Sequence, residues 1–378
     1  MLAKTDFITY KEIYQQPELW SKVFQIVYSQ KDDLKRFIDK FRKNDGGEVI
    51  FTGAGSSFFV GEIVAGIFQK NTGFSSKAVS TTEIVTHPGH YINPAKQTLM
   101  ISFARSGNSP ESIGAIKHAD LISDKILHLI ITCNKDGKLV KMLNGNPRYV
   151  LTMPEEANDK GLAMTSSVTS MALSVLLISH LDNLDEQENK VLQAAKYARY
   201  ILSEYTSVLR KVAKLDFNRA VFLGSGPFMG VAREAHLKLQ EMTDGRVICK
   251  FDSFLSFRHG PKAVLNEKTL LVYFFSNNKY VKKYESDLVL SVAKNHKLLG
   301  VVSVSETFQK EKVSDYEIVM TSEEKMLDES YLTLCSLIPA QLLAYYKSLI
   351  VGLNPDNPSS GAIHRVVQGV TIYDYVNE

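Results

Sequence analysis

Short apolar runs alternate with amphipathic stretches through most of the chain. The apolar runs of the first half fall at residues 48–52, 98–103, 126–132 and 148–152, and stretches with a helical period separate them. Apolar runs without polar alternation are typical of strands that are buried on both faces. Strands of this kind that alternate with helices predict an α/β protein whose parallel sheet is doubly wound, with helices on both faces.

The same pattern of runs occurs twice. One offset of 171 positions aligns three pairs of runs, namely 49–55 with 220–226, 99–103 with 270–274, and 129–132 with 300–303. A fourth pair, 149–152 and 318–321, aligns when the offset slips to about 169, which one change in loop length explains. The repetition predicts two tandem α/β domains.

The segments outside the two copies set the expected domain boundaries. Residues 186–214 form a charged helical pattern that can link the copies, and residues 354–361 contain too many breakers for a helix or strand. We expect an N-terminal helical segment at 1–45, a first domain at 46–185, a linking helix at 186–214, a second domain at 215–350 and a C-terminal tail at 351–378.

Composition narrows the class of protein. Of the 378 residues, 44% are hydrophobic and 22% are charged, with a net charge of +3, so neither a nucleic acid nor a membrane is expected as a partner. The three cysteines, Cys133, Cys249 and Cys335, are far apart and form no CxxC pair, which argues against a zinc site and a disulfide framework. Without an apolar N-terminal segment, we expect a cytoplasmic protein.

Loops rich in hydroxyl groups follow the first two strands of copy one. They contain, in chain order, Gly55, Ser56, Ser57, Arg105, Ser106, Gly107 and Ser109. Ligands of parallel sheets bind at the carboxyl ends of the strands, and helix N-termini attract anions, although serines in such turns also serve as helix caps. Copy two lacks the Ser-Gly-x-Ser arrangement, so the sequence predicts a phosphate site in copy one only.

A third cluster of hydroxyl groups follows the last strand of copy one. Thr165 and Ser166 lie there at a predicted helix start. They either contact a ligand or cap the helix, and the sequence leaves both readings open.

The first helix of copy two, at about residues 229–243, carries three charges on one side. Glu234, Lys238 and Glu241 share a helical face, which is typical of a solvated face with ion pairs. The segment 257–262 then holds His259 in a turn between cations. A carboxylate base and a histidine are what proton transfer beside a sugar carbonyl requires, so this helix and turn are the candidate catalytic elements.

The ordered motifs resemble those of the sugar isomerase (SIS) family. Residues 224–226, 234–241 and 259–261 resemble the second SIS domain of glucosamine-6-phosphate synthase, and residues 55–57 with 106–107 resemble the sugar-phosphate loops of its first SIS domain. Residues 163–167, 257–262 and 354–359 are similar to the AgaS group, described as tagatose-6-phosphate ketose/aldose isomerases or galactosamine-6-phosphate deaminases. No glutaminase domain precedes the motifs, so glutamine is not expected as a source of ammonia.

The resemblance implies roles for individual residues. Glu241 matches the base that moves a proton between C1 and C2, His259 matches a histidine that assists ring opening, and Lys238 matches a lysine of the same motif. Because the family contributes this histidine across a dimer interface, the resemblance implies a homodimer. Gln368 stands where the synthase has a C-terminal lysine, and nearby His364 and Arg365 are possible substitutes.

The expected function is therefore that of an enzyme acting on a sugar phosphate, without a cofactor or a metal. The resemblance implies that it converts an aminohexose 6-phosphate, above all galactosamine 6-phosphate, to tagatose 6-phosphate and ammonia. Aldose-ketose isomerisation without deamination remains an alternative, since the same proton transfer serves it. A sugar-phosphate sensor without catalysis is a third reading, which the presence of Glu241 and His259 disfavours.

Overall fold

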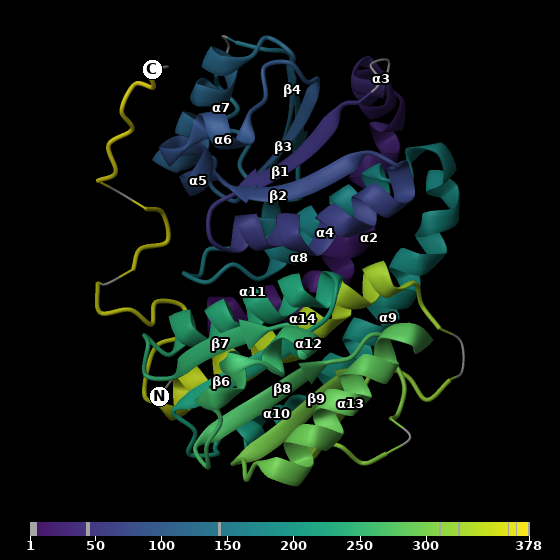
Figure 1. Ribbon diagram of the computed structural model, residues 1–378, viewed down its shortest axis with the longest axis vertical. Helices are drawn as coiled ribbons and strands as arrows, with labels where there is room; N and C mark the ends of the chain where they lie inside the picture. Colours follow the sequence, from purple (N-terminus) through teal and green to yellow (C-terminus); the bar gives the residue numbers. More distant parts are fainter. Residues whose placement is uncertain are drawn as a thin grey trace. The chain divides into compact units, whose positions relative to one another are not determined.

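Two five-stranded parallel sheets form the framework of the protein (Figure 1). The computed structural model describes residues 6–42, 46–142, 145–309, 311–323, 326–361, 363–367 and 369–376. These residues fall into two compact units. The first-sheet unit comprises Lys22–Asp159, Ser166–Gln187 and Ile363–Glu378, and the second-sheet unit comprises Met1–Ser21, Lys160–Thr165 and Glu188–Ala362. The prediction of an α/β protein with two tandem parallel sheets is confirmed.

The first sheet has the strand order β2-β1-β3-β4-β5. Its strands are β1 (Glu48–Gly53), β2 (Ser75–Ser80), β3 (Thr98–Ala104), β4 (Ile126–Thr132) and β5 (Arg148–Thr152). The helices that precede or accompany it are α1 (Ile8–Tyr14), α2 (Gln16–Ser29), α3 (Lys31–Arg42), α4 (Ser56–Thr72), α5 (Thr81–Thr86), α6 (Pro88–Tyr91), α7 (Pro110–Ile122) and α8 (Ser166–Ile178), with 3-10 turns at Glu155–Ala157 and Leu181–Gln187.

The second sheet repeats this topology with the order β10-β9-β8-β6-β7. Its strands are β6 (Arg219–Gly224), β7 (Ile248–Asp252), β8 (Thr269–Phe274), β9 (Gly300–Ser305) and β10 (Tyr316–Val319). The accompanying helices are α9 (Glu188–Glu204), α10 (Thr206–Ala213), α11 (Pro227–Met242), α12 (Phe254–Phe257), α13 (Lys279–Asn295) and α14 (Glu329–Ile350), with a 3-10 turn at Gly260–Val264. The segment expected as one linking helix contains two, α9 and α10.

Each sheet contains an equivalent core contact, and the two contacts are related by the offset of 171 positions seen in the sequence. In the first sheet, the rings of Phe51 and Phe103 stack with centroids 6.1 Å apart and planes within 9°. In the second sheet, Phe222 and Phe274 stack at 6.4 Å and 12°. Since each pair bridges the first and third strands of its copy, the repeated apolar pattern encodes a repeated core.

The turns that follow the first strand of each sheet also match. Gly55 has a φ of +56° and Gly226 a φ of +57°, and each precedes the helix that follows its strand, α4 or α11. A positive φ of this size is accessible to glycine at little cost. The sequence motif Gly-x-Gly therefore encodes a sharp turn from strand to helix in both copies.

The ends of the chain join different units. In the second-sheet unit, the Asp356 carboxylate accepts hydrogen bonds from the backbone N–H groups of Ile8 (2.9 Å) and Thr9 (2.7 Å) and so caps α1. In the first-sheet unit, His118 Nε2 lies 3.0 Å from the carbonyl oxygen of Tyr373. The predicted tail is thus divided between the two units.

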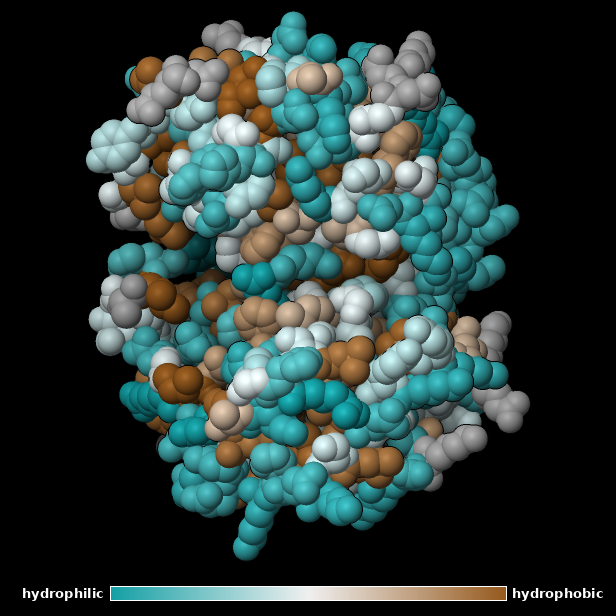
Figure 2. All heavy atoms as spheres, in the orientation of Figure 1, coloured by the Kyte–Doolittle hydropathy of each residue, from teal (hydrophilic) through white to brown (hydrophobic). Residues whose placement is uncertain are grey.

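One face of the protein mixes hydrophilic and apolar residues (Figure 2). On the face that Figure 2 shows, apolar residues occur in small groups among hydrophilic ones. Within the described ranges, none of the helices combines the length and the apolar character needed to cross a lipid bilayer.

Candidate active site

The loop after β1 forms the start of α4 in the first-sheet unit. Ser57 N donates to Ala54 O (3.2 Å) and Phe58 N donates to Gly55 O (2.9 Å), so the loop closes as a tight turn at the carboxyl end of the strand. The side chains of Ser56 and Ser57 are buried. The structure therefore holds Gly55, Ser56 and Ser57 together at the sheet edge where α/β proteins bind ligands.

The loop after β3 places its serines in two different settings. Ser106 Oγ accepts a hydrogen bond from Asn108 N (3.2 Å), and Gly107 has a φ of +65°. Ser109 Oγ accepts from Ser112 N (3.3 Å) and caps α7. Capping accounts for Ser109, whereas Ser106 is partly exposed at the same sheet edge.

Arg105 is tied to the C-terminal segment. It is buried, and its Nη2 donates to the carbonyl oxygen of Arg365. Arg365 in turn donates from Nε to Asp159 O (2.9 Å) and from Nη2 to Asn158 Oδ1 (3.1 Å). Two arginines distant in sequence therefore meet beside the loop that follows β3, an arrangement that the sequence analysis missed because no local pattern links them.

A buried carboxylate caps α8. Asp159 accepts hydrogen bonds from Ser166 N (3.0 Å), Ser167 N (2.9 Å) and Ser167 Oγ (2.5 Å). Thr165 is fully buried, and its carbonyl oxygen accepts from Gln341 Nε2 (3.5 Å) in the second-sheet unit. The amides of this helix start thus have a protein acceptor, and a ligand contact by Thr165 or Ser166 stays a prediction.

The charged face of α11 is buried. Glu234 and Lys238 are 0% and 1% exposed, so the solvated-face interpretation of this helix is wrong. Lys238 Nζ lies 3.4 Å from Glu234 Oε1 and donates to Glu241 Oε2 at 2.7 Å. The Glu241 side chain keeps 24% of its surface exposed. One buried cation therefore lies between a buried carboxylate and one that a ligand can reach.

The charge of Lys238 persists in this setting. Burial alone lowers the pKa of a lysine, but the carboxylates of Glu234 and Glu241, with their hydrogen bonds, raise the pKa of Lys238 above its ordinary value. Nearby His236 behaves differently, because burial lowers its pKa to about 4 and keeps its ring neutral at pH 7. Lys238 can therefore hold Glu241 in one position.

His259 lies on a different element from this cluster. It is exposed at the start of the 3-10 turn Gly260–Val264. In the part of the chain that the structure describes, no hydrogen bond or ion pair joins His259 to Glu241. The ring is consequently available to a ligand or to another subunit.

The matching edge of the second sheet holds carboxyl groups of the protein itself. Ser276 occupies the place of Arg105, and its N–H donates to Glu285 Oε2 at 3.1 Å. Ser276 Oγ also donates to Glu329. Burial raises the pKa of Glu285 to about 8, so this group is largely protonated at pH 7. The described residues at this edge thus place carboxyl groups around Ser276, and phosphate binding by copy one only stays a prediction.

No metal cluster is evident in the described ranges, where no three His, Cys, Asp or Glu side chains gather to bind an ion. Gln368, expected as a substrate contact, lies outside the described residues.

Comparisons with known proteins identify the family. Residues 44–181 match the SIS domain model. The chain is 35% identical to D-galactosamine-6-phosphate deaminase AgaS of Escherichia coli over 376 residues, which cover 99% of this chain and 97% of the relative. This chain belongs to the AgaS family.

Solved structures agree with this membership. The structure of tagatose-6-phosphate ketose/aldose isomerase from Escherichia coli superposes with a TM-score of 0.90 at 32% identity, covering 99% of this chain and 98% of that one. The C-terminal domain of glucosamine-fructose-6-phosphate aminotransferase from Francisella tularensis shares the fold, with a TM-score of 0.74 at 20% identity over 93% of this chain and 99% of that one. Membership of the AgaS family confirms the prediction of a sugar-phosphate isomerase or deaminase.

Proposed function

We propose that the protein converts galactosamine 6-phosphate to tagatose 6-phosphate and ammonia. The observation that carries the proposal is the Glu234–Lys238–Glu241 cluster on α11, in a chain 35% identical to an AgaS deaminase. A buried cluster with one accessible carboxylate suits a general base in a proton transfer.

The chemistry needs one base and one acid. Ring opening first frees the aldehyde at C1, with His259 assisting the movement of the ring proton. Glu241 then removes the proton from C2 while the aldehyde oxygen takes up a proton, which gives an enolamine. Glu241 returns its proton to C1 while the amino group loses one, so that C1 becomes a hydroxymethyl group and C2 carries an imine. Water adds to the imine carbon, and ammonia leaves to give the ketose. Lys238 positions Glu241 throughout.

The first-sheet unit is the proposed phosphate site. Ser56 and Ser57 begin α4 after β1, and Ser106 follows the buried Arg105 in the loop after β3. Hydroxyl and amide donors at a parallel sheet edge, next to a guanidinium group, match the geometry and charge of a phosphate monoester. The second sheet places the carboxyl group of Glu285 at its matching edge, which supports binding in one unit only.

We further propose that His259 acts in a homodimer. The ring is exposed, and it makes no hydrogen bond or ion pair with Glu241 in the described part of the chain. An exposed turn of this kind can supply its histidine to the site of a second subunit.

Simple isomerisation is the second candidate, because a solved relative bears the name of an isomerase. Purified full-length protein, assayed for ammonia release from galactosamine 6-phosphate and glucosamine 6-phosphate and for conversion of tagatose 6-phosphate, separates the two. Ammonia from the galacto sugar supports deamination. Conversion of tagatose 6-phosphate to its aldose without any ammonia release from either amino sugar contradicts it and favours isomerisation.

A further inference from the structure

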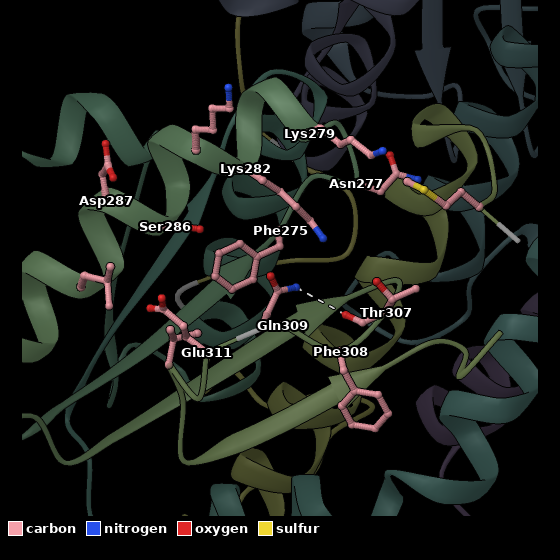
Figure 3. Close-up of a pocket in the computed structure, with 14 residues that line it drawn as sticks. Phe275, Asn277, Lys279, Lys282, Ser286, Asp287, Thr307, Phe308, Gln309 and Glu311 are labelled. Carbon is pink, nitrogen blue, oxygen red and sulfur yellow. Dashed lines mark hydrogen bonds between the residues drawn. The ribbon is translucent and has the colours of Figure 1, made fainter. Parts of the chain in front are cut away.

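A cavity lies in the second-sheet unit, at the carboxyl ends of β8 and β9 (Figure 3). Its volume is about 730 Å³, which is within the range of small-molecule sites. Helix α13 and the loop after β9 form much of its wall. None of the residues proposed for the reaction lines it.

Lysines on α13 give one end of the cavity a positive charge. Lys279 and Lys282 lie one turn apart on the helix, and Lys282 extends toward the middle of the cavity (Figure 3). Lys282 is half-buried, and it forms no ion pair or hydrogen bond with the residues that the structure describes. Burial lowers its pKa, so the charged form is poorly solvated there. A partly desolvated cation without an acceptor favours an anionic ligand.

The N-terminus of α13 is not the source of this attraction. Asn278 caps the helix, with Oδ1 accepting from Tyr280 N (2.9 Å) and Val281 N (3.4 Å). The lysine side chains therefore supply the charge that an anion would meet.

Acidic groups also lie near the lysines, and the carboxyl groups of Glu285 and Glu306 attract Lys282 without forming an ion pair with it. Asp287 and Glu311 line the cavity at the end opposite to Asn277 in Figure 3. The carboxyl group of Glu285 is largely protonated at pH 7 because burial raises its pKa to about 8. The Glu306 carboxylate accepts from Asn277 Nδ2 at 2.7 Å and from Tyr197 at 3.3 Å.

The remaining wall is apolar. Phe275 is buried at the base of the cavity, while Leu290, Phe308 and Met326 are 47%, 62% and 50% exposed at its rim. Large exposed apolar side chains that surround a cavity favour a ligand with an aromatic or apolar body. Gln309 adds an amide, whose Nε2 lies 3.4 Å from Thr307 O.

We propose that this cavity binds a phosphate monoester that carries an aromatic body, such as a nucleoside monophosphate. The phosphate lies against Lys279 and Lys282, and the aromatic body lies against Phe275 and Phe308. Such a ligand matches both the positive charge and the apolar side chains of the wall. It differs from the sugar phosphate of the proposed reaction, which has no aromatic body.

Calorimetric titration of the full-length protein with adenosine 5′-monophosphate tests the proposal. Inorganic phosphate, adenosine and galactosamine 6-phosphate are titrated in parallel. Lys282→Ala is compared with Lys294→Ala, which removes an exposed lysine of the same helix that does not line the cavity. Retained turnover of the proposed substrate, or an unchanged thermal transition if there is no turnover, shows that each variant is folded.

Saturable binding of the nucleotide that weakens at least tenfold in Lys282→Ala, and not in Lys294→Ala, supports the proposal. Binding also weakens as salt is added, since the contact is between charges. Absence of saturable binding at millimolar nucleotide overturns the proposal, as does equal affinity in the two variants. Binding of galactosamine 6-phosphate that depends on Lys282, without binding of the nucleotide, contradicts the claim that the ligand carries an aromatic body.

Discussion

Lys238 donates a hydrogen bond to Glu241 across 2.7 Å, from one turn earlier on α11. The same ammonium group lies 3.4 Å from Glu234, which is fully buried. A buried pair is costly to form, and it is more costly to break, because the charge left behind loses its compensation. The cluster therefore ties the stability of α11 to the position of the proposed base.

Lys238→Met is expected to lower the free energy of unfolding by about 3–5 kcal/mol, because Glu234 then loses its buried cation. Urea denaturation measures this change. Lys250→Met is the matched control, since Lys250 lies 3.8 Å from Asp252 with 38% of its side chain exposed, and we expect a loss of at most about 1 kcal/mol.

The same variant tests the positioning role of Lys238. Loss of the 2.7 Å hydrogen bond leaves the Glu241 carboxylate less fixed in position, so kcat for ammonia release should fall by about tenfold or more in Lys238→Met while KM changes little. An unchanged kcat in protein that is still folded would restrict Lys238 to a structural role.

Arg365→Ala is expected to destabilise the protein by about 1–3 kcal/mol, since it removes charged donors from Asp159 O and Asn158 Oδ1. It should also raise the KM for the sugar phosphate, because the side chain of Arg365 anchors the segment whose backbone carbonyl at position 365 accepts from Arg105 beside the proposed phosphate site. Arg36→Ala, which breaks an exposed pair with Asp33, is the control and should change neither quantity appreciably.

His236 makes stability depend on pH. Its pKa falls to about 4 on folding from an ordinary value of 6.5, so the unfolded chain binds the proton first as the pH drops. Its contribution to stability is fully present above pH 6.5 and is lost as the pH falls from 6.5 to about 4. The loss amounts to about 2–3 kcal/mol by pH 4.5. His236→Phe should flatten this part of the curve of unfolding free energy against pH. Equal slopes for both proteins would show that burial of His236 is not the cause.

Gly55→Ala should lower the free energy of unfolding by about 1–2 kcal/mol, because Gly55 has a φ of +56°, which strains a residue with a Cβ. The space around the new Cβ is open, so backbone strain is the cause and not a clash. Gly66→Ala, inside α4 and equally open, should instead stabilise the protein by about 0.5–1 kcal/mol. Thermal or urea unfolding compares the two. A similar change in both variants would contradict the assigned turn.

Much of the fold could be predicted from the sequence, because the buried central strands are apolar throughout. Strands β1, β3, β4 and β5 fall at the predicted runs, and the offset of 171 positions reappears in the stacked phenylalanine pairs. Strands β2 and β7 were not predicted. Both are edge strands, partly exposed, and β2 contains three serines and a lysine, so its pattern gives no strand signal.

The site could be predicted only where its residues share a local motif. The loops at Ser56 and Ser106 and the charges of α11 were found in this way. The contacts of Arg365 with Asn158 and Asp159 join residues more than 200 positions apart, and no short pattern encodes them. Burial of Glu234 was also missed, since a charged face next to an apolar stripe is usually solvated.

In the proposed reaction, Glu241 transfers the proton from C2 to C1, and loss of ammonia depends on this transfer. The most direct test is the rate of ammonia release from galactosamine 6-phosphate by the unaltered protein, by Glu241→Gln and by the exposed control Glu267→Gln. We predict release by the unaltered protein and the control, with a loss of roughly a hundredfold or more in Glu241→Gln. Release by Glu241→Gln at a rate close to that of the control would contradict the assignment.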